Sequence, residues 1–204
     1  MRLTMTTFIT LDGVYQGPGG PEEDTGGGFT QGGWFQPYFD EEVDAFMDAV
    51  FQDAEGFVLG RKTYDIFAAY WPKMAEQPDP ISQGLNQLPK YVVSHTLTGV
   101  DWTNSRILSG DPVAEVAKLK EQPGKELQIH GSGVLGASLI DARLVDTLRL
   151  VVCPVVLGSG RRLFGEGRTP TAFHLRESRA TPSGVALQVF DLAGDPTYGT
   201  FGVE

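Results

Sequence analysis

The stretch Gly131-Ser132-Gly133-Val134-Leu135-Gly136 is a G-x-G-x-x-G turn, placed where a predicted strand gives way to a predicted helix. The residues before it, 126–130, read Glu-Leu-Gln-Ile-His and are typical of a short strand, while residues 134–140 carry the apolar positions of a buried helix. Such a turn leaves backbone N–H groups free at a helix N-terminus, where the helix dipole favours an anion such as a pyrophosphate. The turn therefore indicates an α/β fold with a phosphate site at the end of a strand.

A Rossmann dinucleotide-binding unit does not fit this turn, for two reasons. Such a unit needs an acidic residue about 20 positions beyond the glycines to bind the ribose, and residues 150–154 here read Leu-Val-Val-Cys-Pro. The turn also comes late in a chain of 204 residues, so too little sequence follows it to complete a doubly wound sheet. We therefore expect a phosphate-binding turn in another α/β fold.

Composition and charge narrow the class of protein. With 41% hydrophobic and 21% charged residues, we expect one globular domain over residues 1–204, cytoplasmic and without a membrane span. The net charge of −10 argues against binding to nucleic acid. The three histidines, His95, His130 and His174, lack metal-ligand spacing, so we expect no metal site. Cys153 is the single cysteine, which excludes an internal disulfide and is typical of a buried apolar position.

Strands and helices alternate along the rest of the chain, which ends in two strands. Predicted strands cover residues 5–11, 57–59, 91–94, 126–130, 148–157, 173–178 and 185–192, and predicted helices cover residues 40–53, 60–69, 112–122 and 134–140. This order predicts an α/β fold, with a mostly parallel central sheet flanked by helices and antiparallel C-terminal strands.

Residues 17–33 form a glycine-rich segment between two predicted elements. Loops of this length inside a domain are usually lids or binding loops. The alternative is a disordered surface excursion, and the composition by itself leaves both interpretations open.

A second strand-to-helix turn, Gly60-Arg61-Lys62-Thr63, offers a helix N-terminus, two cations and a hydroxyl. Cations oppose the dipole at a helix N-terminus, so their placement favours a bound anion nearby. Together with Gly131-Ser132-Gly133, this turn predicts a clamp for the two ends of a dinucleotide at one edge of the sheet. Ser94, at the end of the intervening strand, belongs to the same edge.

Three segments together carry a resemblance to a known family. They are residues 57–64 (Phe-Val-Leu-Gly-Arg-Lys-Thr-Tyr), residues 127–133 (Leu-Gln-Ile-His-Gly-Ser-Gly) and residues 148–160 (Leu-Arg-Leu-Val-Val-Cys-Pro-Val-Val-Leu-Gly-Ser-Gly). The chain resembles the dihydrofolate-reductase-like superfamily over nearly its whole length. It is most similar to the branch typified by the reductase domain of the bifunctional riboflavin-biosynthesis deaminase/reductase.

The resemblance implies NADPH as hydride donor. Arg61 would contact the adenosine 2′-phosphate, with Ser94 and His95 beside it. The pyrophosphate would be faced by Lys62, Thr63, Ser132 and Gly133. In the family, a glycine pair after the strand can form a cis peptide; here His130 replaces the first glycine, so a cis His130–Gly131 bond is a hypothesis.

On the substrate side, the resemblance implies an acidic residue that orients the ring, early in the first long helix and after a tryptophan-containing loop. Trp34 and Asp40 occupy about these places, although Asp40 can equally be the N-cap of its helix. Asp12 is the rival acid, because it follows the first strand at the edge where ligands bind in α/β sheets. It can also be a simple turn aspartate before Gly13.

The riboflavin-pathway reductases carry an Asp-x-Pro-x-Leu segment after the threonine, whereas residues 65–72 read Asp-Ile-Phe-Ala-Ala-Tyr-Trp-Pro here. We also expect no deaminase domain before them. We therefore predict a stand-alone NADPH-dependent reductase of a pterin- or aminopyrimidine-like small molecule. Its reaction would resemble 5-amino-6-(5-phosphoribosylamino)uracil reduction. The alternative is a non-catalytic dinucleotide-binding sensor or scaffold. The resemblance also implies a homodimer formed through the sheet edge.

Overall fold

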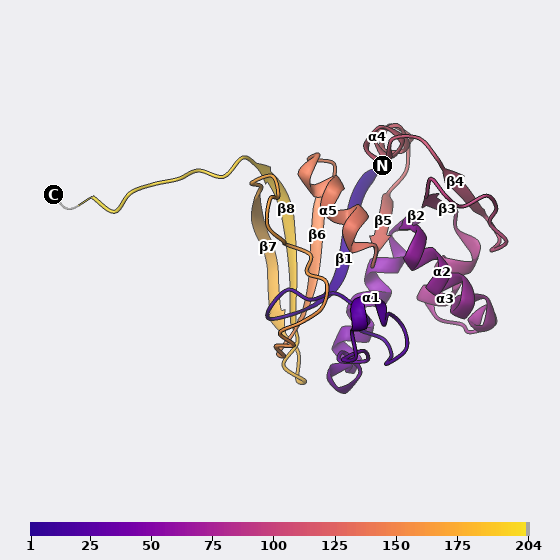
Figure 1. Cartoon of the computed structure of the whole chain (residues 1–204), viewed down its shortest axis with the longest axis horizontal. Helices are drawn as coiled ribbons and strands as arrows, with labels where there is room; N and C mark the ends of the chain where they lie inside the picture. Colours follow the sequence, from indigo (N-terminus) through magenta and orange to yellow (C-terminus); the bar gives the residue numbers. More distant parts are fainter. Residues whose placement is uncertain (203–204) are drawn as a thin grey trace.

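The computed structural model describes residues 1–202 and contains one eight-stranded sheet in the order β4-β3-β2-β5-β1-β6-β8-β7 (Figure 1). The strands are β1 (Arg2–Thr10), β2 (Ala54–Gly60), β3 (Lys90–Val93), β4 (Ser105–Leu108), β5 (Glu126–His130), β6 (Thr147–Cys153), β7 (Ala172–Ala180) and β8 (Ala186–Gly194). All pairings are parallel except β6–β8 and β7–β8. The predicted mostly parallel sheet with antiparallel C-terminal strands is confirmed.

Helices cover both faces of this sheet. They are α1 (Glu41–Gln52), α2 (Arg61–Tyr70), α3 (Pro80–Gln87), α4 (Pro112–Lys120) and α5 (Gly133–Asp141), with short 3-10 turns η1 (Gly26–Gly28), η2 (Gln36–Tyr38) and η3 (Trp71–Met74). Apolar residues of α1, α2 and α3 pack into one core, and those of α4 and α5 into the core on the opposite face.

The connections after β2 and β5 leave these neighbouring strands on opposite faces. The chain passes from β2 to β3 toward one edge of the sheet, and from β5 to β6 toward the other. Because parallel crossovers are right-handed, α2 and α5 must lie on opposite faces. Ligands in α/β sheets bind at such a point, beyond the carboxyl ends of the strands. Both predicted turns of the clamp lie here.

The structure corrects one predicted boundary and adds two elements that the sequence analysis does not predict. β6 ends at Cys153 rather than at residue 157, because Pro154 cannot donate to a strand ladder. The edge strand β4 was missed, since its four residues are too short for a clear alternation. Helix α3 was missed although Asp79 caps it and Pro80 opens it, the same signal that predicts α4.

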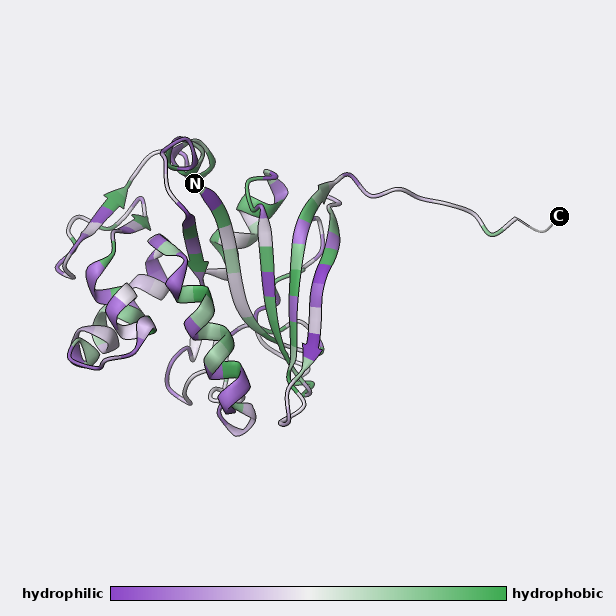
Figure 2. Ribbon diagram, turned by 180° about the vertical axis from the view of Figure 1, so that it is seen from behind, coloured by the Kyte–Doolittle hydropathy of each residue, from purple (hydrophilic) through white to green (hydrophobic). Residues whose placement is uncertain are grey.

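At the far edge of the sheet, β7 exposes polar residues along its length (Figure 2). Beyond β8, residues 195–202 extend away from the body of the molecule (Figure 1). The homodimer through the sheet edge stays a prediction. Within residues 1–202, none of the helices has both the length and the apolar character needed to cross a bilayer.

Lys90 is fully buried at the start of β3, where its Nζ donates to Leu85 O at 2.6 Å and Leu88 O at 2.9 Å. Burial lowers the pKa of Lys90 from 10.5 to about 8. Between these two pH values the unfolded chain holds a proton that the folded protein lacks, so stability rises with pH. We expect a gain of up to about 3 kcal/mol in the free energy of unfolding from pH 8 to 10.5.

Urea unfolding across this range, compared between the parent protein and Lys90→Met, measures the effect. The variant should have the flatter profile. Equal slopes in the two proteins would contradict the assignment to Lys90.

Candidate functional site

The two glycine-containing turns are joined directly by hydrogen bonds. Gly60 N donates to Ser132 Oγ at 3.0 Å, and Ser132 N donates to Thr63 Oγ1 at 2.9 Å. The backbone at the start of α2 and that at the start of α5 are therefore held side by side. The structure brings together Gly60, Thr63, Gly131, Ser132 and Gly133, as the clamp prediction requires.

The glycine turn has a left-handed backbone at two successive positions. Gly131 has φ +56° and Ser132 has φ +49°. A Cβ built on Gly131 would lie 3.2 Å from Thr63 Oγ1, so the close approach of the two turns also requires glycine there. Within residues 1–202 every peptide bond is trans, and the hypothesis of a cis His130–Gly131 bond is wrong for this structure.

The two clamp helices, α2 and α5, differ from the other three α-helices in how their N-termini are capped. The side chains of Asp40, Asp79 and Asp111 accept backbone N–H groups at the starts of α1, α3 and α4. Helices α2 and α5 have no side-chain cap. A helix N-terminus without a side-chain cap can bind an external anion, and this fits a dinucleotide pyrophosphate.

Next to the glycine turn, β1 continues beyond the end of its pairing with β5. β1 pairs with β5 only as far as Thr6, opposite His130, but it pairs with β6 as far as Thr10. On the side toward β2, residues 7–10 of β1 therefore have no partner strand. Thr10 N donates to Val14 O and Thr10 O accepts Gly13 N, so the part of this edge left for a ligand is residues 7–9. Its backbone groups can bind a flat ring that carries an amide, as nicotinamide does.

Tyr15 was not singled out by the sequence, yet its ring lies against the first residue of α5. A Cβ on Gly133 would collide with the Tyr15 ring, so this contact requires glycine. The residue is partly buried and packs beside the α5 core. Tyr15 can be recognised only from the structure, because an isolated tyrosine after a strand forms no sequence motif.

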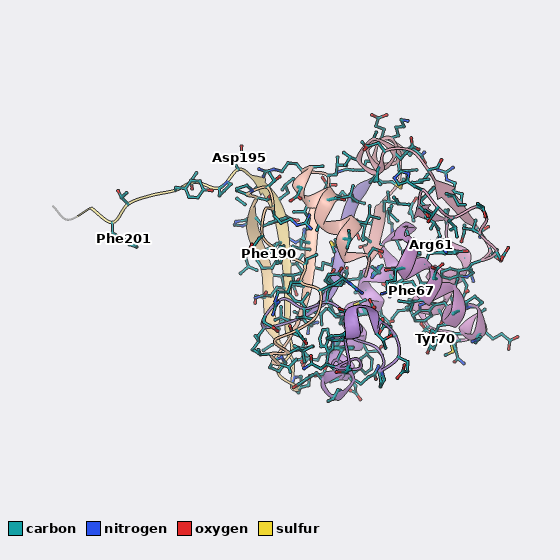
Figure 3. All side chains as sticks on the ribbon, in the orientation of Figure 1. Arg61, Phe67, Tyr70, Phe190, Asp195 and Phe201 are labelled. Atoms are coloured by element: carbon teal, nitrogen blue, oxygen red, sulfur yellow. The ribbon has the colours of Figure 1, made fainter. Side chains whose placement is uncertain are left out.

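At the end of β3, Arg61 meets residues 94–96. Its Nε donates to Asp65 Oδ2 at 3.0 Å and its Nη1 to Thr96 Oγ1 at 3.2 Å. Ser94 is buried and its Oγ accepts Thr96 N at 3.3 Å, while the exposed His95 places Nδ1 3.0 Å from Ser109 O. Figure 3 shows Arg61 at the opposite end of α2 from Tyr70. An exposed guanidinium beside a serine turn fits a phosphate group.

Lys62 contacts the glycine-rich segment through its half-exposed side chain. Its Nζ pairs with Asp24, which also pairs with Arg161. Sequence reasoning missed both partners, because Asp24 lies within a run of turn residues and Arg161 lies about 100 positions from Lys62.

Asp12 forms an anchor between β1 and the segment that follows β6. Its carboxylate accepts hydrogen bonds from Thr10 Oγ1 at 2.6 Å, Gly158 N at 2.9 Å and Arg162 Nη2 at 2.9 Å. The Thr10 hydroxyl, with the Leu157 and Gly158 amides and Arg162, holds the pKa of Asp12 well below its usual value against the effect of desolvation. An acid held ionised in this way is suited to positioning and poorly suited to donating a proton at neutral pH.

Asp40 is the N-cap of α1. Its Oδ1 accepts Glu42 N at 3.1 Å and Val43 N at 2.9 Å, and its Oδ2 accepts Ser183 N at 3.0 Å. Desolvation opposes ionisation, but these hydrogen bonds outweigh it and lower the pKa of Asp40. Trp34 is buried and donates Nε1 to Gln16 O at 2.8 Å, which ties it to the glycine-rich segment. Of the two interpretations of Asp40, the structure supports the cap.

A surface hollow of about 540 Å³ lies on the segment that follows β6. Its lining consists of Gly160, Arg162, Phe164, Gly165 and Glu166. Arg162 also donates Nε to Asp12 O at 2.8 Å, so the hollow adjoins the carboxyl end of β1. It is the candidate place for a substrate on the edge that carries the clamp.

Comparisons with known proteins agree with this architecture. The family model described as the RibD C-terminal domain matches residues 2–187. The protein YyaP of Bacillus subtilis, itself uncharacterized, is 31% identical over 95% of this chain and 96% of its own length. A solved structure attributed to riboflavin biosynthesis, from Shewanella sp. PV-4, has a TM-score of 0.73 at 22% identity and covers 94% of this chain and 99% of that one. Dihydrofolate reductase from Enterococcus faecalis, complexed with NADP(H), has a TM-score of 0.59 at 13% identity. The match covers 94% of this chain and 96% of that one.

Proposed function

The chain belongs to the RibD C-terminal domain family, and from this membership we propose that it is an NADPH-dependent reductase of a pterin- or aminopyrimidine-like heterocycle. The observation that carries the proposal is the pair of uncapped helices α2 and α5, hydrogen-bonded through Ser132 and Thr63. The family membership supports a reductase, and the geometry supports a dinucleotide whose pyrophosphate would lie between the starts of α2 and α5 and whose 2′-phosphate would lie at Arg61.

In the proposed reaction, NADPH supplies the hydride when bound, and the protein supplies binding and orientation. The free N–H groups of α2 and α5 would bind the pyrophosphate. Arg61 would bind the 2′-phosphate at the end of β3. The unpaired edge of β1 would hold the nicotinamide amide and so fix the ring beside the glycine turn.

The substrate would bind next to the nicotinamide, on the side of the hollow that contains Arg162. Asp12 fixes this end of β1 by holding Arg162 and the backbone of residues 157–158. The position of the hollow supports a small heterocyclic substrate. Asp65 pairs with Arg61 and Phe67 packs against Trp71, so the α2 segment that departs from the riboflavin reductases is occupied by internal contacts.

Selectivity for the 2′-phosphate tests the proposal. Arg61→Ala should weaken NADPH binding by about 10- to 100-fold, because a hydrogen bond to a charged group contributes about 1.5–3 kcal/mol. NADH binding, which involves no 2′-phosphate, should change less than about twofold. Fluorescence titration of both cofactors measures the difference.

Arg176→Ala on β7 is the matched control, since Arg176 pairs with Asp191 on an edge of the sheet far from the clamp. It should bind both cofactors as the parent does. The role of Arg61 is refuted by equal affinities of the parent protein for NADPH and NADH.

A non-catalytic dinucleotide-binding protein is the second candidate function. Its support is that Asp12 and Asp40 both have lowered pKa values, so neither is ready to donate a proton. NADPH binding with no oxidation of the cofactor by any pterin, aminopyrimidine or carbonyl compound would favour this candidate over the reductase.

A further inference from the structure

Three charged side chains from separate segments meet beside Gly26. A Cβ built on this glycine would lie 2.9 Å from Lys62 Nζ, 3.1 Å from Asp24 Oδ1 and 3.2 Å from Arg161 Nη1. Lys62 comes from the first turn of α2, Arg161 from the segment after β6, and Asp24 from the glycine-rich segment. The ends of the three side chains therefore converge on the backbone of Gly26.

Asp24 is the centre of this cluster. Its side chain is only 8% exposed, and its two oxygens pair with different cations, Oδ1 with Lys62 and Oδ2 with Arg161. Gly26 N donates to Oδ1 at 3.1 Å, and Gln16 Nε2 donates to the Asp24 carbonyl at 3.0 Å. A carboxylate removed from water needs such partners, so the fold of residues 17–33 depends on the two cations.

Lys62 and Arg161 both bind Asp24 and are also partly exposed at the surface of the site. The side chains of Lys62 and Arg161 are 53% and 35% exposed, so both retain donors that face solvent. Two positive charges on one carboxylate leave an excess of one positive charge in the cluster. Lys62 carries one of these charges on the first turn of α2, a helix that has no side-chain N-cap. An anion would find a cation and a helix N-terminus together here.

We propose that Asp24 is a positioning residue of the cofactor site and that Arg161 is a second cation, beside Lys62, for the phosphates of the dinucleotide. The inference rests on the proposed function. Asp24 holds both cations in place before the phosphates arrive. Because the glycine-rich segment and the phosphates use the same two side chains, order in residues 17–33 and phosphate binding are thermodynamically coupled.

Amide hydrogen exchange of residues 17–33 tests this coupling, measured without ligand, with NADPH and with inorganic pyrophosphate. In the parent protein both ligands should slow exchange in this segment. Asp24→Asn should speed exchange without ligand and weaken NADPH binding, each by about tenfold, and should abolish the protection by ligand. Glu22→Gln is the matched control, since it removes one charge from an exposed position of the same segment, and it should behave as the parent.

The ligands separate failure of this inference from failure of the proposed function. If the parent protein binds no NADPH, the proposed function is wrong, and protection by pyrophosphate alone then decides the inference. The inference is overturned if neither ligand protects residues 17–33, or if Asp24→Asn keeps the parent's exchange and affinity.

Arg161→Lys provides a second test if Asp24→Asn loses its fold. The lysine keeps a positive charge for Asp24 but lacks the further guanidinium donors that face solvent. We expect exchange without ligand to stay close to that of the parent and pyrophosphate to bind about three- to tenfold more weakly. Unchanged pyrophosphate affinity would remove Arg161 from the site.

Discussion

Acid should destabilise this protein by as much as about 5 kcal/mol between pH 6.5 and pH 3, through His130 alone. Burial, reinforced by the positive charge of Arg149, lowers the pKa of His130 from 6.5 to about 3. Below pH 6.5 the unfolded chain binds a proton that the folded protein cannot accept. The free energy of unfolding therefore falls as the pH drops, and above pH 6.5 this contribution is constant.

The surroundings of His130 explain why the neutral ring is retained. The ring stacks on Phe51, with centroids 4.5 Å apart, and Nε2 lies 2.9 Å from Gln128 Oε1. Gln128 uses its Nε2 to donate to Val50 O and to Glu126 Oε2, so its Oε1 is the acceptor. His130 must then donate from Nε2, which fixes the neutral tautomer with an unprotonated Nδ1.

Urea unfolding at pH 6.5, 5.5 and 4.5 measures the effect, in a range above the titration of Asp12 and Asp40. His130→Gln keeps a donor for Gln128 without a titrating group, so it should be less stable at neutral pH but show a much flatter pH profile. His174→Gln, at an exposed position on β7, should keep the parent's profile. A steep acid slope that survives in His130→Gln would contradict the prediction.

Local patterns predicted those parts of the fold that depend on neighbouring residues. The Asp111-Pro112 cap, the apolar stripe of α1 and the glycine turn each carry their signal within a few positions. The approach of the two clamp turns was also predictable, because parallel strands place their carboxyl ends at one edge. In the structure the two turns are joined by the hydrogen bond from Ser132 N to Thr63 Oγ1.

Contacts between distant segments were beyond sequence reasoning. The glycine-rich segment was open to interpretation as lid or disordered excursion, because the composition of residues 17–33 does not show that Asp24 pairs with Lys62 and Arg161. Tyr15 is placed on Gly133 by the path of the chain after β1. The register of β5 against β1 creates the unpaired edge, and no motif encodes this register.

Glu126→Gln should lower the free energy of unfolding by about 3–5 kcal/mol, because it breaks the buried ion pair between Glu126 and Arg149. Two hydrogen bonds join the pair, Nη1 to Oε2 at 3.0 Å and Nη2 to Oε1 at 2.8 Å. The two side chains are only 9% and 12% exposed. Removing the negative charge leaves a guanidinium in the interior beside an amide, and the guanidinium cannot lose its proton to escape the cost.

Glu42→Gln is the matched control for this prediction, because Glu42 also pairs with an arginine, Arg179, at 2.7 Å, but both side chains are well exposed. Its loss should stay below about 1 kcal/mol, since solvent screens the charges and hydrates whichever one is left. Denaturant midpoints at pH 7.5 compare the two variants by the same chemical change. Equal losses would mean that water reaches Arg149, and that its charge is then too well screened to help keep His130 neutral. The acid slope assigned to His130 would in that case have to come from burial alone.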